Sequence, residues 1–148
     1  MDTILPSDFK EFLKLLNSRN VKYLLIGGYA VGYHGYSRAT ADMDVWIDVD
    51  PDNAGRVVSA LREFGFMSTE LEPDLFLQVG KVIRMGVPPL RIEILTTISG
   101  VSFPDCYPLR ITARIDGIEV PVISLEHLKI NKKASGRFKD LADLEHLK

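Results

Sequence analysis

Two aspartates, Asp42 and Asp44, stand two positions apart in the segment TADMDVWID. The segment alternates apolar and polar residues as a half-buried β-strand does, and side chains two positions apart on a strand project from the same face. Two carboxylates side by side repel each other and raise each other's pKa unless a cation lies between them. A hard divalent cation such as Mg²⁺ prefers oxygen ligands. The pair therefore predicts a metal site that can also bind a phosphate.

A third acidic residue, Glu93, lies in the later segment LRIEILT, which alternates in the same way. If its strand neighbours the strand of Asp42 and Asp44, Glu93 completes an acidic trio with them. An isolated Asp-x-Asp pair is common on solvated strands, so the pair alone leaves a purely structural interpretation open.

The glycine pair Gly27-Gly28 ends the apolar segment VKYLLIG, and the residues after it can form a short helix. Backbone N–H groups at such a junction can bind anionic oxygens, and glycine lets a phosphate approach closely. The segment has neither the GxGxxG pattern of a dinucleotide fold nor the GK[ST] ending of a P-loop, so it belongs to neither class. A tight turn without a ligand explains the glycines equally simply.

The surrounding pattern predicts the elements that position these residues. A helix is expected over residues 8–18 with Ser7 as its N-cap, and a second helix between Asp50-Pro51 and Gly65. Two strands are expected on either side of the Gly86–Pro89 turn, and a hairpin at Asp116-Gly117. From Ser124 onward the pattern predicts two short helices that separate near Gly136.

The order of these elements predicts an α+β fold with a mixed β-sheet, with helices packed mainly on one face and C-terminal helices after it. We expect a single domain over residues 1–148, with a core at about 20–123 and a helical segment at about 124–148. The net charge of −2 argues against a surface that grips nucleic acid throughout. The chain has one cysteine and no apolar run long enough to span a membrane, so we expect a cytoplasmic protein.

The segment IGGYAVGYHGYSRATADMDVWID resembles the nucleotidyltransferase superfamily, which has the DNA polymerase beta fold. The signature of that superfamily is a hydrophobic residue, Gly, Gly or Ser, a gap, Asp-hydrophobic-Asp, and a third acid on a later strand. The segments RIEILTTISGVSF and ISLEHLKINKKASGRFKDLADLEHL resemble small bacterial nucleotidyltransferase-like proteins related to abortive-infection toxins. Together these pieces span about residues 22–147.

The resemblance implies that Gly27 and Gly28 hold the phosphates of a nucleotide. It also implies that Asp42, Asp44 and Glu93 are the catalytic carboxylates and ligate Mg²⁺, with Mn²⁺ as the alternative. The sequence departs from the family pattern twice. Gly28 stands where the family often has Ser, and Glu93 stands where it often has the shorter Asp, so Glu93 can differ in metal geometry or act as a base.

Further nucleotide-binding candidates come from the same resemblance: Lys132, Asp140, Arg38 and Thr40. Lys132 lies near the apolar stripe of the helix after Ser124, and it either extends to solvent or reaches the acidic cleft and pairs with the triphosphate. Arg38 and Thr40 precede the acidic pair, where a loop arginine and a strand-starting threonine are the alternative interpretation.

Other residues are expected to have lesser roles. Trp46 shares the carboxylate face, and packing under the C-terminal helices is favoured over stacking on a base. We interpret Lys133, Arg137 and Lys139 as a solvated basic face or a contact for an RNA acceptor.

The sequence thus predicts a Mg²⁺-dependent nucleotidyltransferase that transfers a nucleoside monophosphate from an NTP to a hydroxyl of RNA, protein or a small molecule. The resemblance suggests a toxin or defence role with an antitoxin protein as partner. One alternative is a degenerate domain that binds a nucleotide or a partner without chemistry. Another is a small antibiotic-modifying adenylyltransferase, ranked third because only the acidic cleft marks a pocket for a polycationic drug.

Overall fold

The computed structural model describes residues 5–36, 41–66, 68–86 and 90–147 of the chain. Its sheet has six strands in the order β3-β4-β2-β1-β6-β5. The strands are β1 (Tyr23–Ile26), β2 (Asp42–Ile47), β3 (Val82–Met85), β4 (Arg91–Leu95), β5 (Ile111–Ile115) and β6 (Ile118–Val122). The helices are α1 (Ser7–Ser18), α2 (Gly27–Tyr33), α3 (Pro51–Phe64), α4 (Phe103–Cys106), α5 (Leu125–Ser135) and α6 (Phe138–His146), with short 3₁₀ helices at Pro73–Leu77 and Tyr107–Leu109.

The sheet is mixed, as predicted. Strand β2 runs antiparallel to β1 and parallel to β4, while β1 runs parallel to β6. The outer strands β3 and β5 pair antiparallel with β4 and β6. Strands β1 and β2 therefore lie at the centre of the sheet, and the predicted acidic segment is held on both sides.

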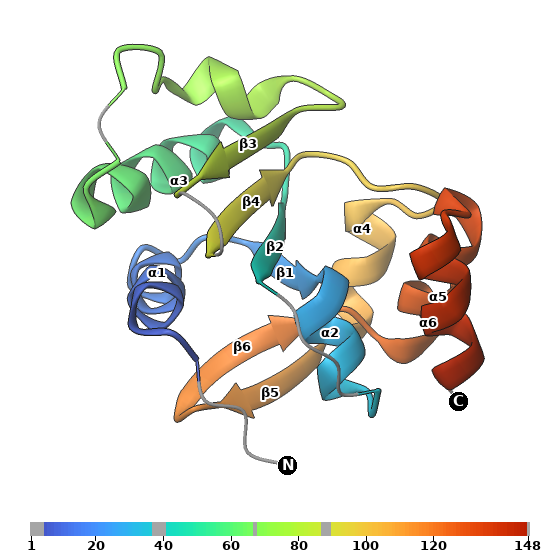
Figure 1. Ribbon diagram of the computed structural model, residues 1–148. Coiled ribbons are helices and arrows are strands. Elements are labelled where there is room, and N and C mark those ends of the chain that lie inside the picture. Colours follow the sequence, from blue (N-terminus) through green and yellow to red (C-terminus); the bar gives the residue numbers. More distant parts are fainter. Residues whose placement is uncertain (1–4, 37–40, 67, 87–89, 148) are drawn as a thin grey trace.

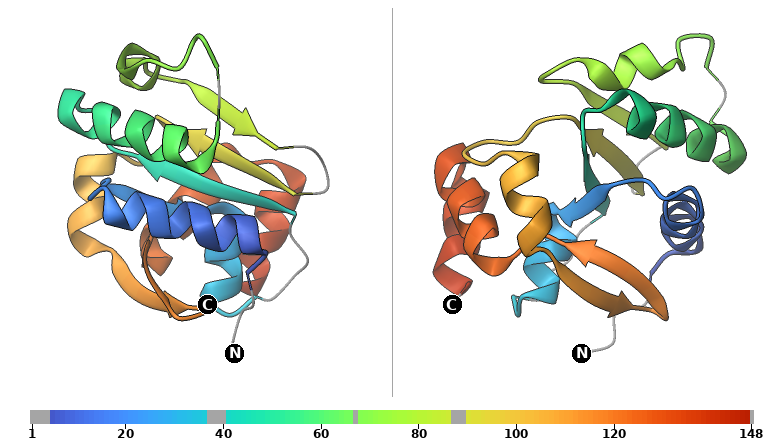
Figure 2. Two further views of the ribbon diagram at one scale, coloured as in Figure 1. Left: turned by 90° about the vertical axis from the view of Figure 1, so that its left-hand side faces the viewer. Right: turned by 180° about the vertical axis from the view of Figure 1, so that it is seen from behind.

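Helices lie on both faces of the sheet, which separates α1 and α3 from α4, α5 and α6 (Figures 1 and 2). The sequence predicted helices mainly on one face of the sheet. The two longest helices, α1 and α3, do share a face, and they pack on each other. On the opposite face, Phe103 of α4 meets Trp46 of β2 edge to face. Trp46 is thus a core residue, as favoured, although its partner belongs to α4 and not to the C-terminal helices.

Two of the three predicted helix caps are present. The side chain of Asp50 accepts a hydrogen bond from the Asn53 backbone N–H at the start of α3, and Ser124 does the same for His127 at the start of α5. Ser7 is not the cap of α1. The helix begins at Ser7 itself with Pro6 as the N-cap residue, and no side chain caps it.

The core lies between the sheet and its helices and takes residues from both. The largest fully buried side chains include Trp46, Tyr23, Phe9, Phe12 and Phe76. The predicted hairpin is formed by β5 and β6, and α5 and α6 are separated by Gly136, which ends α5 in the left-handed conformation. None of the helices in the described part of the chain combines the length and apolar character needed to cross a lipid bilayer.

Candidate functional site

The predicted neighbours β2 and β4 bring Asp44 and Glu93 together. In the parallel pairing of these strands Asp44 lies opposite Glu93, and Asp42 lies opposite Arg91. The two carboxyl groups are close enough for Glu93 to raise the pKa of Asp44. The condition for an acidic trio, that the two strands be adjacent, is therefore met.

Asp44 occupies an environment that disfavours its charge. Burial, together with the neighbouring Glu93 and Asp42, raises the pKa of this carboxyl to about 7, while Lys139 opposes them. Its Oδ1 atom is buried and has no hydrogen-bond partner among the described residues. A buried oxygen without a partner is rare in folded proteins, and it marks a place where a ligand can complete the structure.

Gly27 gives Asp44 the space it needs. Strand β1 places Ile26 opposite Asp44, and the chain then turns into α2 at Gly27, whose φ is +67°. A Cβ atom at this position would overlap Oδ2 of Asp44. Glycine is therefore required both for the backbone conformation and for the carboxylate behind it, a reason that the sequence pattern did not reveal.

Two arginines that sequence reasoning passed over pair with the acidic trio. Arg91 forms a two-pronged contact with Asp42, with Nε to Oδ1 at 3.2 Å and Nη2 to Oδ2 at 3.2 Å. Arg84 of β3 donates from Nε to Glu93 Oε1 at 3.0 Å. Both pairs follow from strand register, because Arg91 lies opposite Asp42 and Arg84 lies opposite Glu93.

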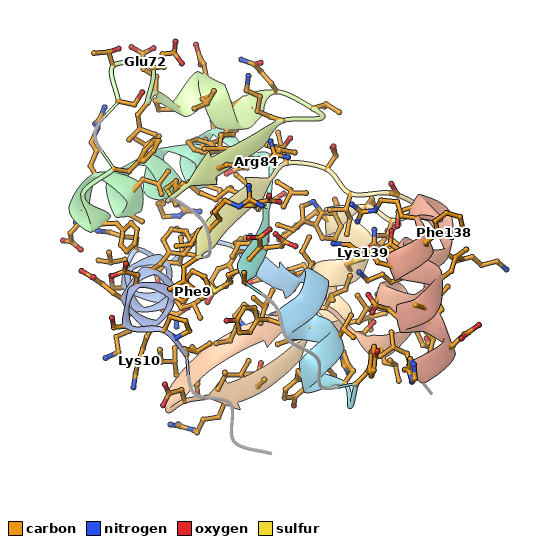
Figure 3. All side chains as sticks on the ribbon, viewed as in Figure 1. Phe9, Lys10, Glu72, Arg84, Phe138 and Lys139 are labelled. Atoms are coloured by element: carbon orange, nitrogen blue, oxygen red, sulfur yellow. The ribbon has the colours of Figure 1, made fainter. Side chains whose placement is uncertain are left out.

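These residues line a cavity of about 1060 Å³. This volume is at the upper end of the range found for small-molecule and cofactor sites. Arg84 and Lys139 come from β3 and α6, on two sides of the cavity, while Phe138 points outward (Figure 3). The charged lining residues are Asp42, Asp44, Glu93, Arg84, Arg91, Lys132, Arg137 and Lys139. More basic than acidic side chains line the cavity, which suits a ligand with several negative charges.

The predicted phosphate-binding residues take different positions. Gly27 and Gly28 line the cavity beside Asp44. Lys132 does not extend to solvent, because its side chain is buried and its Nζ lies 3.1 Å from Asp140 and 3.3 Å from Asp143. Its direct contact with a nucleotide, like that of Asp140, stays a prediction.

Arg38 and Thr40 lie outside the described residues. Arg137 and Lys139, which were expected on a solvated basic face or as a contact for an RNA acceptor, are exposed and also line the cavity. The signal that could have identified Arg137 is its spacing of three residues from Asp140 at a helix start, where the two side chains can pair.

A divalent cation fits the chemistry of the trio but not its present arrangement. Among the described residues, no group of three or more acidic, His or Cys side chains stands ready to hold a metal ion. The carboxylates of Asp42 and Glu93 are turned to Arg91 and Arg84. Asp44 nevertheless offers an unpartnered buried oxygen, and carboxylates on adjacent strands are suitable ligands for Mg²⁺.

The chain is similar to known proteins over nearly its whole length. The model of the family described as aminoglycoside-2''-adenylyltransferase matches residues 8–147. No curated protein sequence matches the chain.

Several solved structures share the fold. A nucleotidyltransferase candidate from Thermotoga maritima superposes with a TM-score of 0.63 at 16% identity, over 97% of this chain and 94% of that one. The lincosamide antibiotic adenylyltransferase LnuA, solved with lincomycin bound, gives 0.60 at 15% identity, over 99% and 98%. The antibiotic-resistance factor ANT(2'')-Ia gives 0.62 at 13% identity, over 95% and 80%.

These findings confirm the predicted superfamily and fold, and they favour an enzyme over a degenerate domain. Nothing in them bears on the predicted toxin or antitoxin. The chain belongs to the aminoglycoside-2''-adenylyltransferase family and is a nucleotidyltransferase, an enzyme of the class that transfers a nucleoside monophosphate from an NTP.

Proposed function

We propose that the chain transfers a nucleoside monophosphate from an NTP to a hydroxyl of a small molecule, in a reaction that depends on a divalent cation. The observation that supports this most strongly is the pair of Asp44 and Glu93 on adjacent parallel strands, with an unpartnered Asp44 oxygen in the wall of a large cavity. The raised pKa of Asp44 and the position of Glu93 beside it describe two close carboxyl groups whose charges a bound cation would stabilise.

In this proposal each acid has a separate task. Asp42 and Asp44 hold Mg²⁺ or Mn²⁺, and Glu93 completes the set. A cation held by these residues would lower the pKa of the acceptor hydroxyl and would neutralise part of the triphosphate charge. The acceptor oxygen attacks the α-phosphorus, the bond to the pyrophosphate breaks, and the hydroxyl proton passes to the Glu93 carboxylate. Gly27 and Gly28 leave room for the phosphates beside these carboxylates.

A small-molecule acceptor is supported by the family description and by two of the structural relatives. The matching family is named for action on aminoglycosides, and LnuA is a lincosamide adenylyltransferase. The cavity has room for a nucleotide, and its basic side chains suit the triphosphate more than a polycationic drug. The drug-like acceptor would therefore enter beside a nucleotide already bound.

The test is a transfer assay with radiolabelled NTPs, Mg²⁺ or Mn²⁺, and separate acceptors: lincomycin, tobramycin and total RNA. We expect labelled drug and an equal amount of pyrophosphate with the wild-type chain. The Asp44→Asn variant, which has almost the same shape, should give neither product. Label in RNA alone would refute the proposal of a small-molecule acceptor and favour the predicted toxin role. If none of the three acceptors is labelled, none of them is a substrate.

A further inference from the structure

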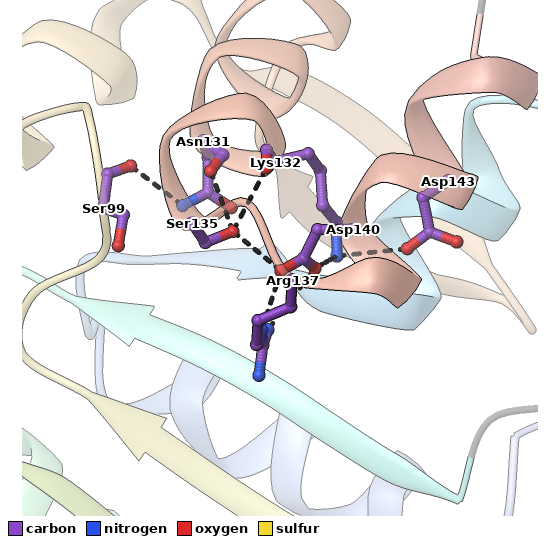
Figure 4. Close-up of polar contacts among 7 residues, drawn as sticks. All are labelled: Ser99, Asn131, Lys132, Ser135, Arg137, Asp140 and Asp143. Carbon is purple, nitrogen blue, oxygen red and sulfur yellow. Dashed lines mark hydrogen bonds and ion pairs between the residues drawn. The ribbon is translucent and has the colours of Figure 1, made fainter.

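A buried cluster of charged side chains joins α5 to α6 beside the cavity (Figure 4). Asp140 has no exposed surface, and Lys132 and Asp143 are exposed by only 4% and 2%. Lys132 of α5 lies between the two aspartates of α6, with Nζ–oxygen distances of 3.1 and 3.3 Å. Buried ion pairs contribute little net stability because removing charges from water is unfavourable, so the cluster calls for another explanation.

Asp140 is the centre of this cluster. Its Oδ2 accepts hydrogen bonds from Ser135 Oγ at 2.8 Å and from Arg137 Nε at 2.7 Å, while its Oδ1 accepts from Lys132. These donors hold the pKa of the Asp140 carboxyl well below its usual range, although burial opposes them. The carboxylate is thus a fixed anion whose position is set from α5.

Arg137 is the exposed charged side chain of the cluster. Its side chain is 66% exposed and lines the cavity, whereas the Asp140 that holds it is fully buried. Its guanidinium is close enough to the opposite wall for Asp44 and Glu93 to raise its pKa, after the larger effect of the Asp140 hydrogen bond. Asp140 accepts hydrogen bonds from Nε and Nη2 of Arg137, and no other described residue accepts a hydrogen bond from this guanidinium. Donors at Nη1 therefore remain directed at solvent in the cavity.

We infer that Arg137 binds the phosphates that leave as pyrophosphate, and that Asp140 is the positioning residue that holds its guanidinium toward the cavity. This inference rests on the proposed function, because it requires an NTP whose α-phosphate reacts at the Asp44–Glu93 pair. The phosphates beyond that point must lie elsewhere in the cavity, and Arg137 faces the pair from the α5–α6 side.

The chemistry of arginine suits this task. A guanidinium presents paired N–H donors that match two phosphate oxygens, and it keeps its charge at all physiological pH values. Charge builds up on the leaving pyrophosphate as the α-phosphorus bond breaks, so a fixed cation there also stabilises the transition state.

Lys132 and Asp143 have an indirect part in this arrangement. Lys132 compensates the charge of both buried aspartates and thereby lets Asp140 remain ionised behind Arg137. In this view Lys132 and Asp140 belong to the nucleotide site without touching the nucleotide, which gives a physical reason for their appearance in the family resemblance.

The test compares binding of ATP and AMP by isothermal titration calorimetry in the presence of Mg²⁺. We expect Arg137→Gln to weaken ATP binding about ten- to a hundredfold and to leave AMP binding unchanged, since AMP lacks the phosphates concerned. Lys133→Gln is the matched control, because it removes one exposed positive charge from α5 at a position that does not line the cavity. It should bind both nucleotides as the wild type does.

The positioning role of Asp140 requires a double-mutant cycle. Asp140→Asn should weaken ATP binding at least fivefold in the wild-type background and have no further effect in the Arg137→Gln background. Since Asp140→Asn can also destabilise the α5–α6 junction, Arg137→Lys provides a second test. Lysine keeps the positive charge but has no Nε–H to donate to Asp140. The Arg137→Lys variant should therefore bind ATP at least fivefold more weakly than the wild type.

The outcomes separate this inference from the proposed function. Wild-type chain that binds ATP and transfers its label, together with an Arg137→Gln variant of unchanged ATP affinity, would overturn the inference alone. Equal losses for ATP and AMP would also overturn it, because Arg137 would then act on the nucleoside, the α-phosphate or the fold. A wild-type chain that binds no nucleotide would overturn both.

Discussion

Asp44 carries the most unusual environment in the molecule. One of its oxygens is buried without a partner, and the other lies against a glycine whose Cβ would occupy the same space. An unsatisfied buried carboxylate oxygen destabilises the folded state, so its retention points to a ligand. The same environment that disfavours the charge of Asp44 makes it ready to bind a cation.

This environment predicts an unusual pH dependence of stability in EDTA. The folded carboxyl has a pKa of about 7, against 3.8 for an unperturbed aspartate. The folded state therefore binds more protons than the unfolded state between these values, and stability falls as pH rises through that window. The Asp44→Asn variant cannot ionise, so its free energy of unfolding should exceed that of the wild type by on the order of 3 kcal/mol above pH 7 and converge toward it near pH 4.

Urea denaturation at a series of pH values measures this difference. The exposed Asp74 provides a control, because Asp74→Asn should show no comparable divergence from the wild type. A difference between Asp44→Asn and the wild type that stays constant from pH 4 to pH 8 would mean that burial does not govern this carboxyl.

The contact between Arg91 and Asp42 leads to a second prediction, which concerns metal affinity. Its guanidinium holds both oxygens of Asp42, which would have to be released for a cation to bind. Arg91→Met should therefore strengthen Mn²⁺ binding, by about two- to fivefold if the contact is worth as much as an ordinary exposed ion pair. Mn²⁺ titration followed by electron paramagnetic resonance measures this directly, with Arg114→Met on the distant β5 as control. Weaker Mn²⁺ binding by Arg91→Met would show that Arg91 supports the metal site.

Individual residues were predictable where a local pattern determines them. The alternation of β2 and β4 placed Asp42, Asp44 and Glu93 on one polar side of the sheet. The contacts of Lys132 were not predictable in this way, because they depend on how α6 returns across α5. Lys132 was placed correctly near the apolar stripe, but nothing local indicates that two aspartates of the next helix receive its ammonium.

At the scale of elements, the junction of β1, β2 and α3 fixes the strand that carries the aspartates. Asn53 of α3 is fully buried and bridges the two strands with its side chain. Its Oδ1 accepts from the Lys22 backbone N–H at 2.7 Å, while its Nδ2 donates to the carbonyls of Lys22 and Asp48 at 3.0 and 2.9 Å. The start of α3 is thereby attached to the end of β2.

Loss of this bridge should destabilise the whole fold. Asn53→Ala removes the side-chain partner of the Lys22 N–H and of the Asp48 carbonyl and leaves space at a fully buried position, so we expect the free energy of unfolding to fall by about 2–4 kcal/mol. Denaturant unfolding followed by circular dichroism measures the change. Asp52→Ala, at an exposed neighbouring position, should change stability by about 0.5 kcal/mol or less. A similarly small effect of Asn53→Ala would mean that the bridge does not hold the strand.

Elements with strong local signals were predicted well from the sequence. The Asp50-Pro51 cap, the Asp116-Gly117 hairpin and the Gly136 break all occur where expected. The prediction of Ser7 as the N-cap of α1 was wrong, because Ser7 is already the first helical residue. The Lys10 N–H donates a hydrogen bond to the Pro6 carbonyl. Which residue becomes the N-cap depends on the backbone geometry at the helix start, and the amino-acid composition does not specify that geometry.

For the whole molecule, the site arises from chain segments that are far apart in sequence. Strands β2 and β4 supply the carboxylates, the β1–α2 turn supplies the glycines, and the α5–α6 junction supplies cations on the other side. The shared fold with nucleotidyltransferase structures explains why weak motifs at these places could be combined, although the identities are only 13–16% in the three compared. The acceptor depends on the rest of the cavity wall and was not predictable from the motifs.

The most direct measurement of this account is the rate of pyrophosphate release, with acceptor and Mg²⁺ present, in the wild type and in Asp44→Asn. We predict that Asp44→Asn lowers the rate at least about a thousandfold while the chain stays folded, because the buried carboxylate would be lost from the reacting centre. A folded Asp44→Asn variant that releases pyrophosphate at the wild-type rate would contradict the central role of the Asp44–Glu93 pair.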